Sequence, residues 1–225
     1  MTWRDIRAVL FDLDGTLIDS AGDLGAAADK LRTDRGLPAL GLKRYRSMVG
    51  SGARGMVGVA LGQQPGDPEY ENLRLEFLRN YERGMIAHTR LFDGVERLLR
   101  AIEARHCLWG IVTNKAMRFA GPLTAALPPL DQAAVLVGGD STPHPKPHPQ
   151  PLLEAARRLS VSPEHCVYVG DDERDVVAGR AAGMRTVVAA YGYLGEGAEH
   201  ASWNAEAHIA HPLELLDLLQ SAAPA

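Results

Sequence analysis

The chain has 225 residues, of which 46% are hydrophobic and 23% are charged, a balance that is typical of a folded globular protein and excludes extensive disorder. Its formal net charge is −4, so it lacks the excess of Lys and Arg that a nucleic-acid-binding surface needs, and we expect no nucleic-acid partner. The two cysteines, Cys107 and Cys166, form no CxxC pair, which argues against a disulfide framework and a structural zinc site.

The N-terminal segment, residues 1–7, is polar where a signal peptide would need an uninterrupted apolar stretch. No segment approaches the roughly 18 consecutive apolar residues of a membrane span. We therefore expect a soluble cytoplasmic protein without a membrane partner. Nothing in the sequence indicates its oligomeric state.

Short apolar runs alternate with longer amphipathic stretches through most of the chain, a pattern typical of a parallel sheet covered by helices. We therefore predict an α/β fold with a Rossmann-like parallel sheet. The expected strands are 6–11, 108–113, 135–139, 166–170, 185–189 and 207–209, and the expected helices are 94–105, 117–126, 149–159, 174–182 and 213–221.

Residues 21–90 interrupt this alternation, because they contain no convincing strand. Their apolar pattern predicts three helical stretches instead, at 21–35, 42–61 and 68–87. The sequence thus predicts a core domain made of residues 1–20 and 91–225, with an inserted helical domain of residues 21–90 that we call the cap.

The first polar cluster follows the first expected strand, in the segment Asp12-Leu13-Asp14-Gly15-Thr16. Two aspartates separated by one residue can point to the same side, and Gly15 permits a sharp turn that lets a substrate approach. Because close carboxylates repel each other, we expect Mg²⁺ to hold them, with Asp12 as an attacking carboxylate and Asp14 as a proton carrier. The alternative, a solvated turn, is disfavoured by the position directly after a hydrophobic strand.

The second and third clusters are weaker by themselves. Thr113 and Asn114 end the strand at 108–113, where they could donate to an anion or act only as a helix N-cap. Lys146 lies in the proline-rich segment 143–149, which would hold it in place to neutralise a phosphate and the nucleophile together. An isolated Lys-Pro would more often be a solvated loop.

The fourth cluster follows the expected strand 166–170 and contains Asp171, Asp172 and Asp175. Asp171 supplies a hard oxygen ligand that could complete a magnesium site begun by Asp12. Asp172 and Asp175 are candidates for residues that surround and support the metal ligands without being ligands themselves. Asp175 could orient a metal-bound water or simply favour the start of the following helix by its charge, and we give the two interpretations equal weight.

These four segments, in this order, resemble the haloacid dehalogenase superfamily over almost the whole chain. Within it the chain is similar to the phosphoglycolate phosphatase branch, whose members carry a small helical cap between the first and second motifs. The resemblance implies a haloacid-dehalogenase-like core with an inserted cap at residues 21–90, and a phosphatase that acts on a small phosphate ester.

The resemblance also implies roles for individual residues. Asp12 would attack phosphorus to form an aspartyl-phosphate, and Asp14 would protonate the leaving oxygen and then activate water. Thr113 and Lys146 would hold the phosphoryl group, with Asn114 beside them. Mg²⁺, the implied cofactor, would be bound by Asp12, by the backbone carbonyl of Asp14 and by Asp171.

Two other functions stay open. A sugar phosphomutase keeps both aspartates, so Asp14 favours phosphate-ester chemistry over dehalogenation without excluding a mutase. Residues 50–55 match GxGxxG by letter and would suggest a non-catalytic dinucleotide-binding protein, but the segment before them is expected to be a polar helix and not the strand that this fingerprint requires.

We interpret this glycine-rich bend as a cap loop that faces the active site, with Ser51 and Arg54 as candidate substrate-binding residues. Arg54 could bind a substrate carboxylate with two hydrogen bonds, or it could be an ordinary surface arginine. The resemblance to the phosphoglycolate phosphatase branch implies two substrates that carry both a phosphate and a carboxylate, of which 2-phosphoglycolate is the first candidate. The rival is N-acetylmuramic acid 6-phosphate, because segments 52–54, 108–115, 118–120 and 191–193 look similar to the muramic-acid phosphatases of cell-wall recycling.

Overall fold

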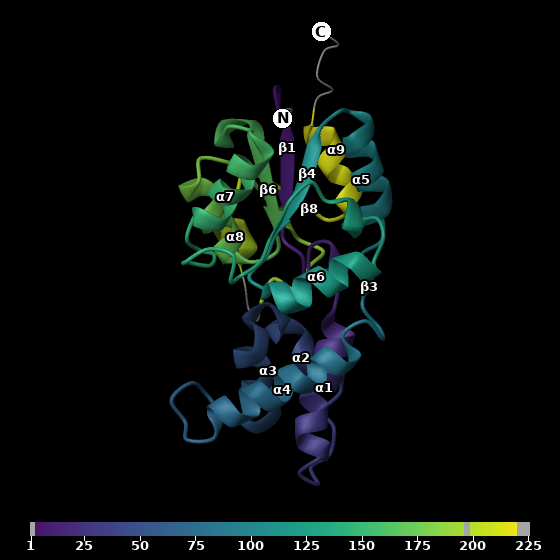
Figure 1. Cartoon of the computed structure of the whole chain (residues 1–225), viewed down its shortest axis with the longest axis vertical. Coiled ribbons are helices and arrows are strands. Elements are labelled where there is room, and N and C mark those ends of the chain that lie inside the picture. Colours follow the sequence, from purple (N-terminus) through teal and green to yellow (C-terminus); the bar gives the residue numbers. More distant parts are fainter. Residues whose placement is uncertain (1–2, 196–198, 220–225) are drawn as a thin grey trace.

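A six-stranded parallel sheet forms the centre of the protein in the computed structural model, which describes residues 3–195 and 199–219 (Figure 1). The strand order is β5-β4-β1-β6-β7-β8. This confirms the predicted α/β fold. The strands are β1 (Ala8–Phe11), β4 (Leu108–Val112), β5 (Leu136–Val137), β6 (Cys166–Gly170), β7 (Arg185–Ala189) and β8 (Ala207–Ile209).

Strand β1 lies in the middle of the sheet and shows how the apolar runs are used. Successive side chains of a strand point to opposite faces. Val9 and Phe11 belong to one hydrophobic cluster, whereas Ala8 and Leu10 belong to another. A continuous apolar run is therefore buried on both faces, as parallel sheets require.

Helices cover both faces of the sheet (Figure 1). Buried residues of α5, α6 and α9 belong to the cluster that contains Val9 and Phe11, and those of α7 and α8 contribute to the one that contains Ala8 and Leu10. The bounds of these helices are α5 (Val95–Ala104), α6 (Met117–Ala126), α7 (Gln150–Leu159), α8 (Glu173–Ala181) and α9 (Leu215–Leu218).

The C-terminal helix is shorter than the predicted 213–221. A 3₁₀ turn at Pro212–Glu214 precedes α9, which ends at Leu218. The last two residues of the predicted helix, 220 and 221, lie outside the described residues.

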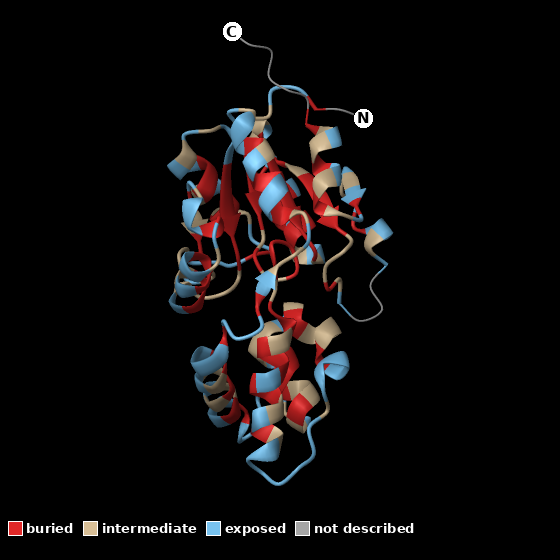
Figure 2. Cartoon of the chain, turned by 90° about the vertical axis from the view of Figure 1, so that its right-hand side faces the viewer, coloured by how far each residue is buried: buried red, intermediate tan, exposed pale blue. Residues whose placement is uncertain are grey.

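The cap segment contains four helices that lie beyond one end of the sheet (Figures 1 and 2). The predicted single stretch 42–61 was wrong in one respect, because a 3₁₀ segment at Arg46–Ser51 divides it. Gly52, with φ of +58°, starts the next helix after this break. The helices are α1 (Ala21–Thr33), α2 (Leu42–Tyr45), α3 (Gly52–Leu61) and α4 (Tyr70–Gly84).

Two chain segments connect the cap to the sheet, and they pair with each other. Strands β2 (Ile18–Asp19) and β3 (Arg90–Leu91) form a short antiparallel ribbon. The sequence analysis missed this ribbon, because two residues per strand are too few to show a period and the partners are far apart in the chain.

The sheet topology determines where the site lies. Within the sheet, β4 and β5 lie on one side of β1, and the chain then crosses to β6 on the other side of β1. Ligands of open parallel sheets bind beyond the carboxyl ends of the strands where the order reverses in this way. No helix among the described residues is long and apolar enough to cross a membrane.

Candidate active site

A cavity of about 490 Å³ lies between the carboxyl ends of the strands and the cap. It brings together residues from all four polar clusters predicted from the sequence. From the core, the cavity is lined by Asp12, Asp14, Thr113, Asn114, Lys115, Arg118, Phe119, Lys146, Asp171, Asp172, Arg174 and Asp175, among others. From the cap, it is lined by Leu24, Val49, Gly50, Ser51, Gly52, Ala53, Arg74, Phe77, Leu78 and Tyr81.

Three carboxylates meet at the base of this cavity. Oxygen atoms of Asp12, Asp171 and Asp175 all lie within 4.8 Å of one another. Burial, followed by the negative charges of Asp12 and Asp175, raises the pKa of Asp171 well above its usual range. Such a group of buried acids is stable as carboxylates only when positive charge lies beside it.

The acidic cluster fits a divalent cation bound by oxygen ligands. The buried Oδ1 atom of Asp12 makes no hydrogen bond, although it lies 3.0 Å from the Lys146 Nζ atom, so it has free acceptor capacity. A Cβ atom at Gly15 would come within 2.1 Å of Asp171 Oδ2, so only glycine lets the loop after β1 approach this carboxylate so closely. Hard carboxylate oxygens are the ligands that Mg²⁺ prefers.

Asp171 is held from two directions. Its Oδ1 atom accepts a hydrogen bond from the Thr16 hydroxyl (3.1 Å), and its Oδ2 atom accepts one from the backbone N–H of Tyr193 (2.8 Å). The loop after β1 and the loop after β7 therefore fix the position of a carboxylate that follows β6.

Lys146 is buried beside the acidic cluster. Its Nζ atom lies 2.6 Å from Asp175 Oδ1 and 3.0 Å from Asp12 Oδ1, and it donates a hydrogen bond to the Tyr168 hydroxyl (2.7 Å). Burial alone would lower the pKa of Lys146, but the charges of Asp12 and Asp175 outweigh it and raise that pKa. The ammonium group therefore stays charged next to Asp12.

Asn114 holds the loop that carries Lys146. Its side-chain amide donates to the Lys146 carbonyl and accepts from the Lys146 N–H, both at 2.9 Å. The adjacent Thr113 is buried, and its hydroxyl accepts a hydrogen bond from the backbone N–H of Lys115 (3.2 Å). Asn114 thus has a structural partner that the sequence analysis, which considered it for substrate binding, did not foresee.

Asp172 and Asp175 form the start of α8. The Asp172 side chain accepts from the Arg174 N–H (3.0 Å), and Asp175 Oδ2 accepts from the Asp172 N–H (3.1 Å), which together make a capping box. Asp175 therefore takes part in the hydrogen bonds that begin α8. Asp175 is also a member of the acidic cluster and pairs there with Lys146.

Asp14 lies at the boundary between the core and the cap. One of its oxygens accepts a hydrogen bond from the Ser20 hydroxyl, and the other lies 3.2 Å from the Nζ atom of Lys115. Burial alone would lower the pKa of Lys115, but the Asp14 carboxylate and the Tyr81 hydroxyl outweigh it and raise that pKa. Asp14 therefore faces a charged lysine that the sequence analysis gave no role.

The cap loop reaches the core where the sequence analysis expected it to. Ser51 is exposed and lines the cavity, and the carbonyl of Gly50 accepts a hydrogen bond from Arg174 (2.5 Å). Arg54 is exposed and is not among the residues that line the cavity. The arginines that do line the cavity include Arg74, on α4, and Arg118, on α6.

The glycine-rich segment 50–55 is not a dinucleotide fingerprint. It spans the end of a 3₁₀ segment and the start of α3, and no strand precedes it within the described part of the cap. The required strand-turn-helix context is therefore absent there, as the sequence predicted.

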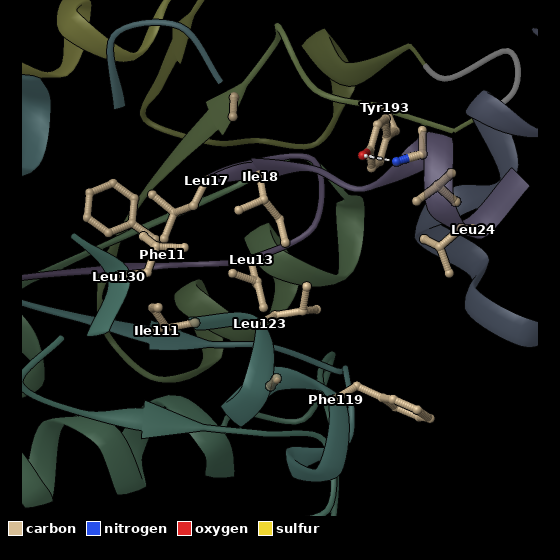
Figure 3. Close-up of a cluster of buried hydrophobic side chains, with 14 of the residues drawn as sticks. Phe11, Leu13, Leu17, Ile18, Leu24, Ile111, Phe119, Leu123, Leu130 and Tyr193 are labelled. Atoms are coloured by element: carbon tan, nitrogen blue, oxygen red, sulfur yellow. Dashed lines mark hydrogen bonds between the residues drawn. The ribbon is translucent and has the colours of Figure 1, made fainter. Parts of the chain in front are cut away.

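Two aromatic residues from the segments of resemblance lie outside the cavity lining. Trp109 is buried in β4, where its Nε1 atom donates to Glu103 (2.7 Å). The Tyr193 hydroxyl accepts from the backbone N–H groups of Ser20 (2.8 Å) and Ala21 (3.1 Å), at the start of α1 (Figure 3). Both residues have structural roles, and that of Tyr193 is to join the core to the cap.

Several residues of the site carried no signal in the sequence. Tyr168 lies inside an apolar strand, Thr16 inside a turn motif, and Tyr81 on an ordinary amphipathic helix. The only available signal was the alternation of side chains along β6, which places Tyr168 and Gly170 on the same face of the sheet. It does not identify Lys146 as the partner of the Tyr168 hydroxyl.

The chain is similar to known proteins over most of its length. The model of the family described as haloacid dehalogenase-like hydrolases matches residues 9–189. An N-acetylmuramic acid 6-phosphate phosphatase of Pseudomonas putida is 42% identical over 217 residues, which cover 96% of this chain and 97% of the relative. A phosphoglycolate phosphatase of Xanthomonas campestris pv. campestris is 46% identical over 209 residues, which cover 93% of this chain and 94% of the relative.

A solved structure shows the same fold. The crystal structure of a "predicted phosphoglycolate phosphatase" from Haemophilus somnus matches with a TM-score of 0.83 at 25% identity, covering 95% of this chain and 97% of the other. The family match spans most of the chain, and both relatives are phosphatases aligned over nearly their whole length. The chain therefore belongs to the haloacid dehalogenase-like hydrolases and is a phosphatase of that family.

Proposed function

We propose that this phosphatase hydrolyses a phosphomonoester through an aspartyl-phosphate formed on Asp12, with Mg²⁺ as its cofactor. The observation that carries the proposal is the setting of Asp12. Its carboxylate lies at the base of the cavity, 3.0 Å from the buried ammonium group of Lys146 and beside Asp171. The proposed nucleophile Asp12 therefore lies beside the ammonium group of Lys146 and beside Asp171, the proposed metal ligand.

The first step transfers the phosphoryl group. An Asp12 oxygen forms a bond to phosphorus while the bond from phosphorus to the ester oxygen breaks, and the leaving oxygen takes a proton from Asp14. Lys146 stabilises the charge on the phosphoryl oxygens. In the second step Asp14 accepts a proton from water, whose oxygen attacks phosphorus and releases phosphate from Asp12.

The residues that would hold the cation are Asp12, Asp171 and the backbone carbonyl of Asp14. Mg²⁺ would neutralise charge on the phosphoryl group and on the carboxylates. Asp175 supports this site through Lys146 and through the start of α8. Thr113, which is buried directly after β4 and lines the cavity, would bind the phosphoryl group through its hydroxyl.

The proposed substrate is a phosphate ester that also carries a carboxylate, and the size of the cavity favours N-acetylmuramic acid 6-phosphate. A volume of about 490 Å³ is in the range of cavities that hold drug-sized ligands. The cap side adds the apolar residues Phe77, Leu78 and Phe119, which a sugar with an acetamido group could contact. The Pseudomonas putida relative is named for this substrate.

Phosphoglycolate is the second candidate, supported by the name of the 46% identical Xanthomonas campestris relative. It is much smaller than the cavity, so its carboxylate would reach the cap side only after closure of the cap around it. Lid closure of this kind also excludes water from the reaction.

A phosphate-release assay tests the proposal. We would compare kcat/KM for N-acetylmuramic acid 6-phosphate, phosphoglycolate, hexose phosphates and p-nitrophenyl phosphate, with Mg²⁺ and with EDTA. We expect release to require Mg²⁺ and to be fastest with the amino-sugar acid. Phosphate moved within a sugar without release would instead indicate a mutase.

The nucleophile is tested by Asp12→Asn, which should lower kcat roughly 10³-fold or more while the protein stays folded. Asp34→Asn is the matched control, because Asp34 is exposed and pairs only with Lys30 among the described residues. Substantial activity in the folded Asp12→Asn variant would exclude the covalent mechanism, and activity indifferent to EDTA would exclude the metal.

A further inference from the structure

A chain of polar contacts runs from the cap to Asp14. The Nζ atom of Lys115 donates a hydrogen bond to the Tyr81 hydroxyl (3.0 Å) and lies 3.2 Å from Asp14 Oδ2. Tyr81 belongs to cap helix α4, Lys115 follows β4, and Asp14 follows β1. Three segments that are distant in the sequence therefore meet at the carboxyl group to which we assign proton transfer.

These contacts are shielded from solvent. The Lys115 side chain is only 9% exposed, and Tyr81 is buried. The Lys115 Nζ atom also lies 4.6 Å from the centre of the Tyr81 ring, over which it makes a cation–π contact. The ring is in turn fixed by Phe119 of the core, at a centroid distance of 5.6 Å.

The contacts also define the orientation of Asp14. Ser20 binds one carboxylate oxygen and Lys115 contacts the other, so the carboxyl group is held at both ends. Ser20 lies in the connection to the cap, and Lys115 is bonded to a cap residue. The hydrogen bond from Ser20 and the ion pair with Lys115 thus link the Asp14 side chain to the connection to the cap and to a cap residue.

We propose that Lys115 and Tyr81 are positioning residues for Asp14, which orient its carboxyl group toward the leaving oxygen while the cap lies over the cavity. Tyr81 places the ammonium group of Lys115, and Lys115 places Asp14. Cap closure would then assemble the acid at the moment when the substrate is enclosed. This inference rests on the proposed phosphatase mechanism and adds residues to it.

The inference concerns one step, the protonation of the leaving group. When the bond from phosphorus to the ester oxygen breaks, its electron pair goes to that oxygen, and the proton comes from Asp14. An alcohol needs this proton, whereas p-nitrophenolate is a good leaving group that departs as an anion. The two kinds of ester therefore separate a defect in Asp14 from a defect in binding or folding.

The experiment compares Tyr81→Phe, Lys115→Met and Lys115→Arg with the parent protein on a sugar phosphate and on p-nitrophenyl phosphate. Tyr45→Phe is the matched control, because Tyr45 is also a buried cap tyrosine whose hydroxyl donates to a carboxylate, Asp29 (2.7 Å), but it does not line the cavity. Circular dichroism and thermal melting check that each variant is folded.

For the sugar phosphate we expect kcat/KM to fall about tenfold in Tyr81→Phe and about a hundredfold in Lys115→Met, with partial recovery in Lys115→Arg. For p-nitrophenyl phosphate we expect changes of less than about threefold, and Tyr45→Phe should match the parent on both esters. The Tyr81→Phe result decides the question if Lys115→Met does not fold.

Equal losses on the two esters, or a loss confined to KM, would overturn the inference, because they would show that the contacts only dock the cap or bind substrate. Unchanged kcat/KM on both esters would overturn it as well. A parent protein that releases phosphate from neither ester would refute the proposed function and this inference together, so the two failures are distinguishable.

Discussion

Lys146 illustrates how single residues of this site are stabilised. A buried ammonium group is costly unless it is paired, and two carboxylates and a tyrosine hydroxyl surround this one. Asn114 fixes the backbone of the loop at the same point. The ammonium group is therefore fixed in position, and in the proposed mechanism a preorganised charge of this kind contributes most to catalysis.

A prediction at this scale concerns Arg118, which lines the cavity and lies 4.4 Å over the Phe119 ring. No carboxylate pairs with it within the described residues, so its guanidinium group is free to bind one from a substrate. We expect Arg118→Ala to raise KM for carboxylate-bearing phosphates about tenfold, with little change in kcat.

Arg54→Ala is the matched control for this prediction, because Arg54 is exposed and lies outside the cavity lining. Steady-state kinetics with a carboxylate-bearing phosphate and with p-nitrophenyl phosphate measures both variants. A larger effect of Arg54→Ala would restore Arg54 as the carboxylate ligand that the sequence suggested.

At the scale of elements, the connection between the cap and the core depends on the start of α1. Asp23 is buried there and accepts hydrogen bonds from the backbone N–H and the hydroxyl of Thr89 (2.9 and 2.7 Å) and from the backbone N–H of His88. Residues 88 and 89 precede β3. The carboxylate thus ties the two connecting segments together next to the β2–β3 ribbon.

We predict that Asp23→Asn destabilises the protein by about 1–3 kcal/mol at pH 7. Burial alone would raise the pKa of Asp23, but the hydrogen bonds from Thr89 and His88 outweigh it and lower that pKa below its usual range. Since the folded-state pKa is below the unfolded value, the stabilisation is present above the unfolded pKa and is lost as the pH falls through the folded pKa.

Chemical denaturation between pH 7 and pH 2 measures this effect. The difference in unfolding free energy between the parent and Asp23→Asn should shrink below about pH 4. The exposed Asp34→Asn variant should show little difference at any pH. A constant difference across the whole range would contradict the role assigned to the charged carboxylate.

On the scale of the whole molecule, the cavity exists because the cap lies over the end of the sheet (Figure 2). Polar contacts cross this boundary at separate points. Arg174 donates to the Gly50 carbonyl, Lys115 to Tyr81, and Arg46 pairs with Asp19 of β2 (3.0 Å). Residues of the cap and of the core therefore line one cavity together.

We predict that Mg²⁺ stabilises the whole fold, because a cation offsets the repulsion among Asp12, Asp171 and Asp175. At about 100 times Kd it should raise Tm by roughly 5 °C or more, and EDTA should reverse the shift. In Asp171→Asn the shift should be absent. A parent Tm that does not respond to Mg²⁺ in differential scanning calorimetry would exclude binding at this cluster.

The sequence by itself determined the α/β fold. A short, continuous apolar run such as residues 166–170 is typical of a strand in a parallel sheet whose two faces are both covered by helices. The sequence also determined which segments lie at the carboxyl ends of the strands. The polar residues that follow these runs, among them Asp12, Lys146 and Asp171, were therefore expected near one another, and they line one cavity.

The partners of these residues were decided only by the tertiary structure. The contact of Lys146 with Asp175, that of Lys115 with Tyr81 and the β2–β3 ribbon all join residues that are far apart in the chain. The tertiary structure also decided that Arg118, and not Arg54, lines the cavity. Such contacts depend on the register of the strands and on where the cap lies over them, and neither leaves a periodic pattern in the local sequence.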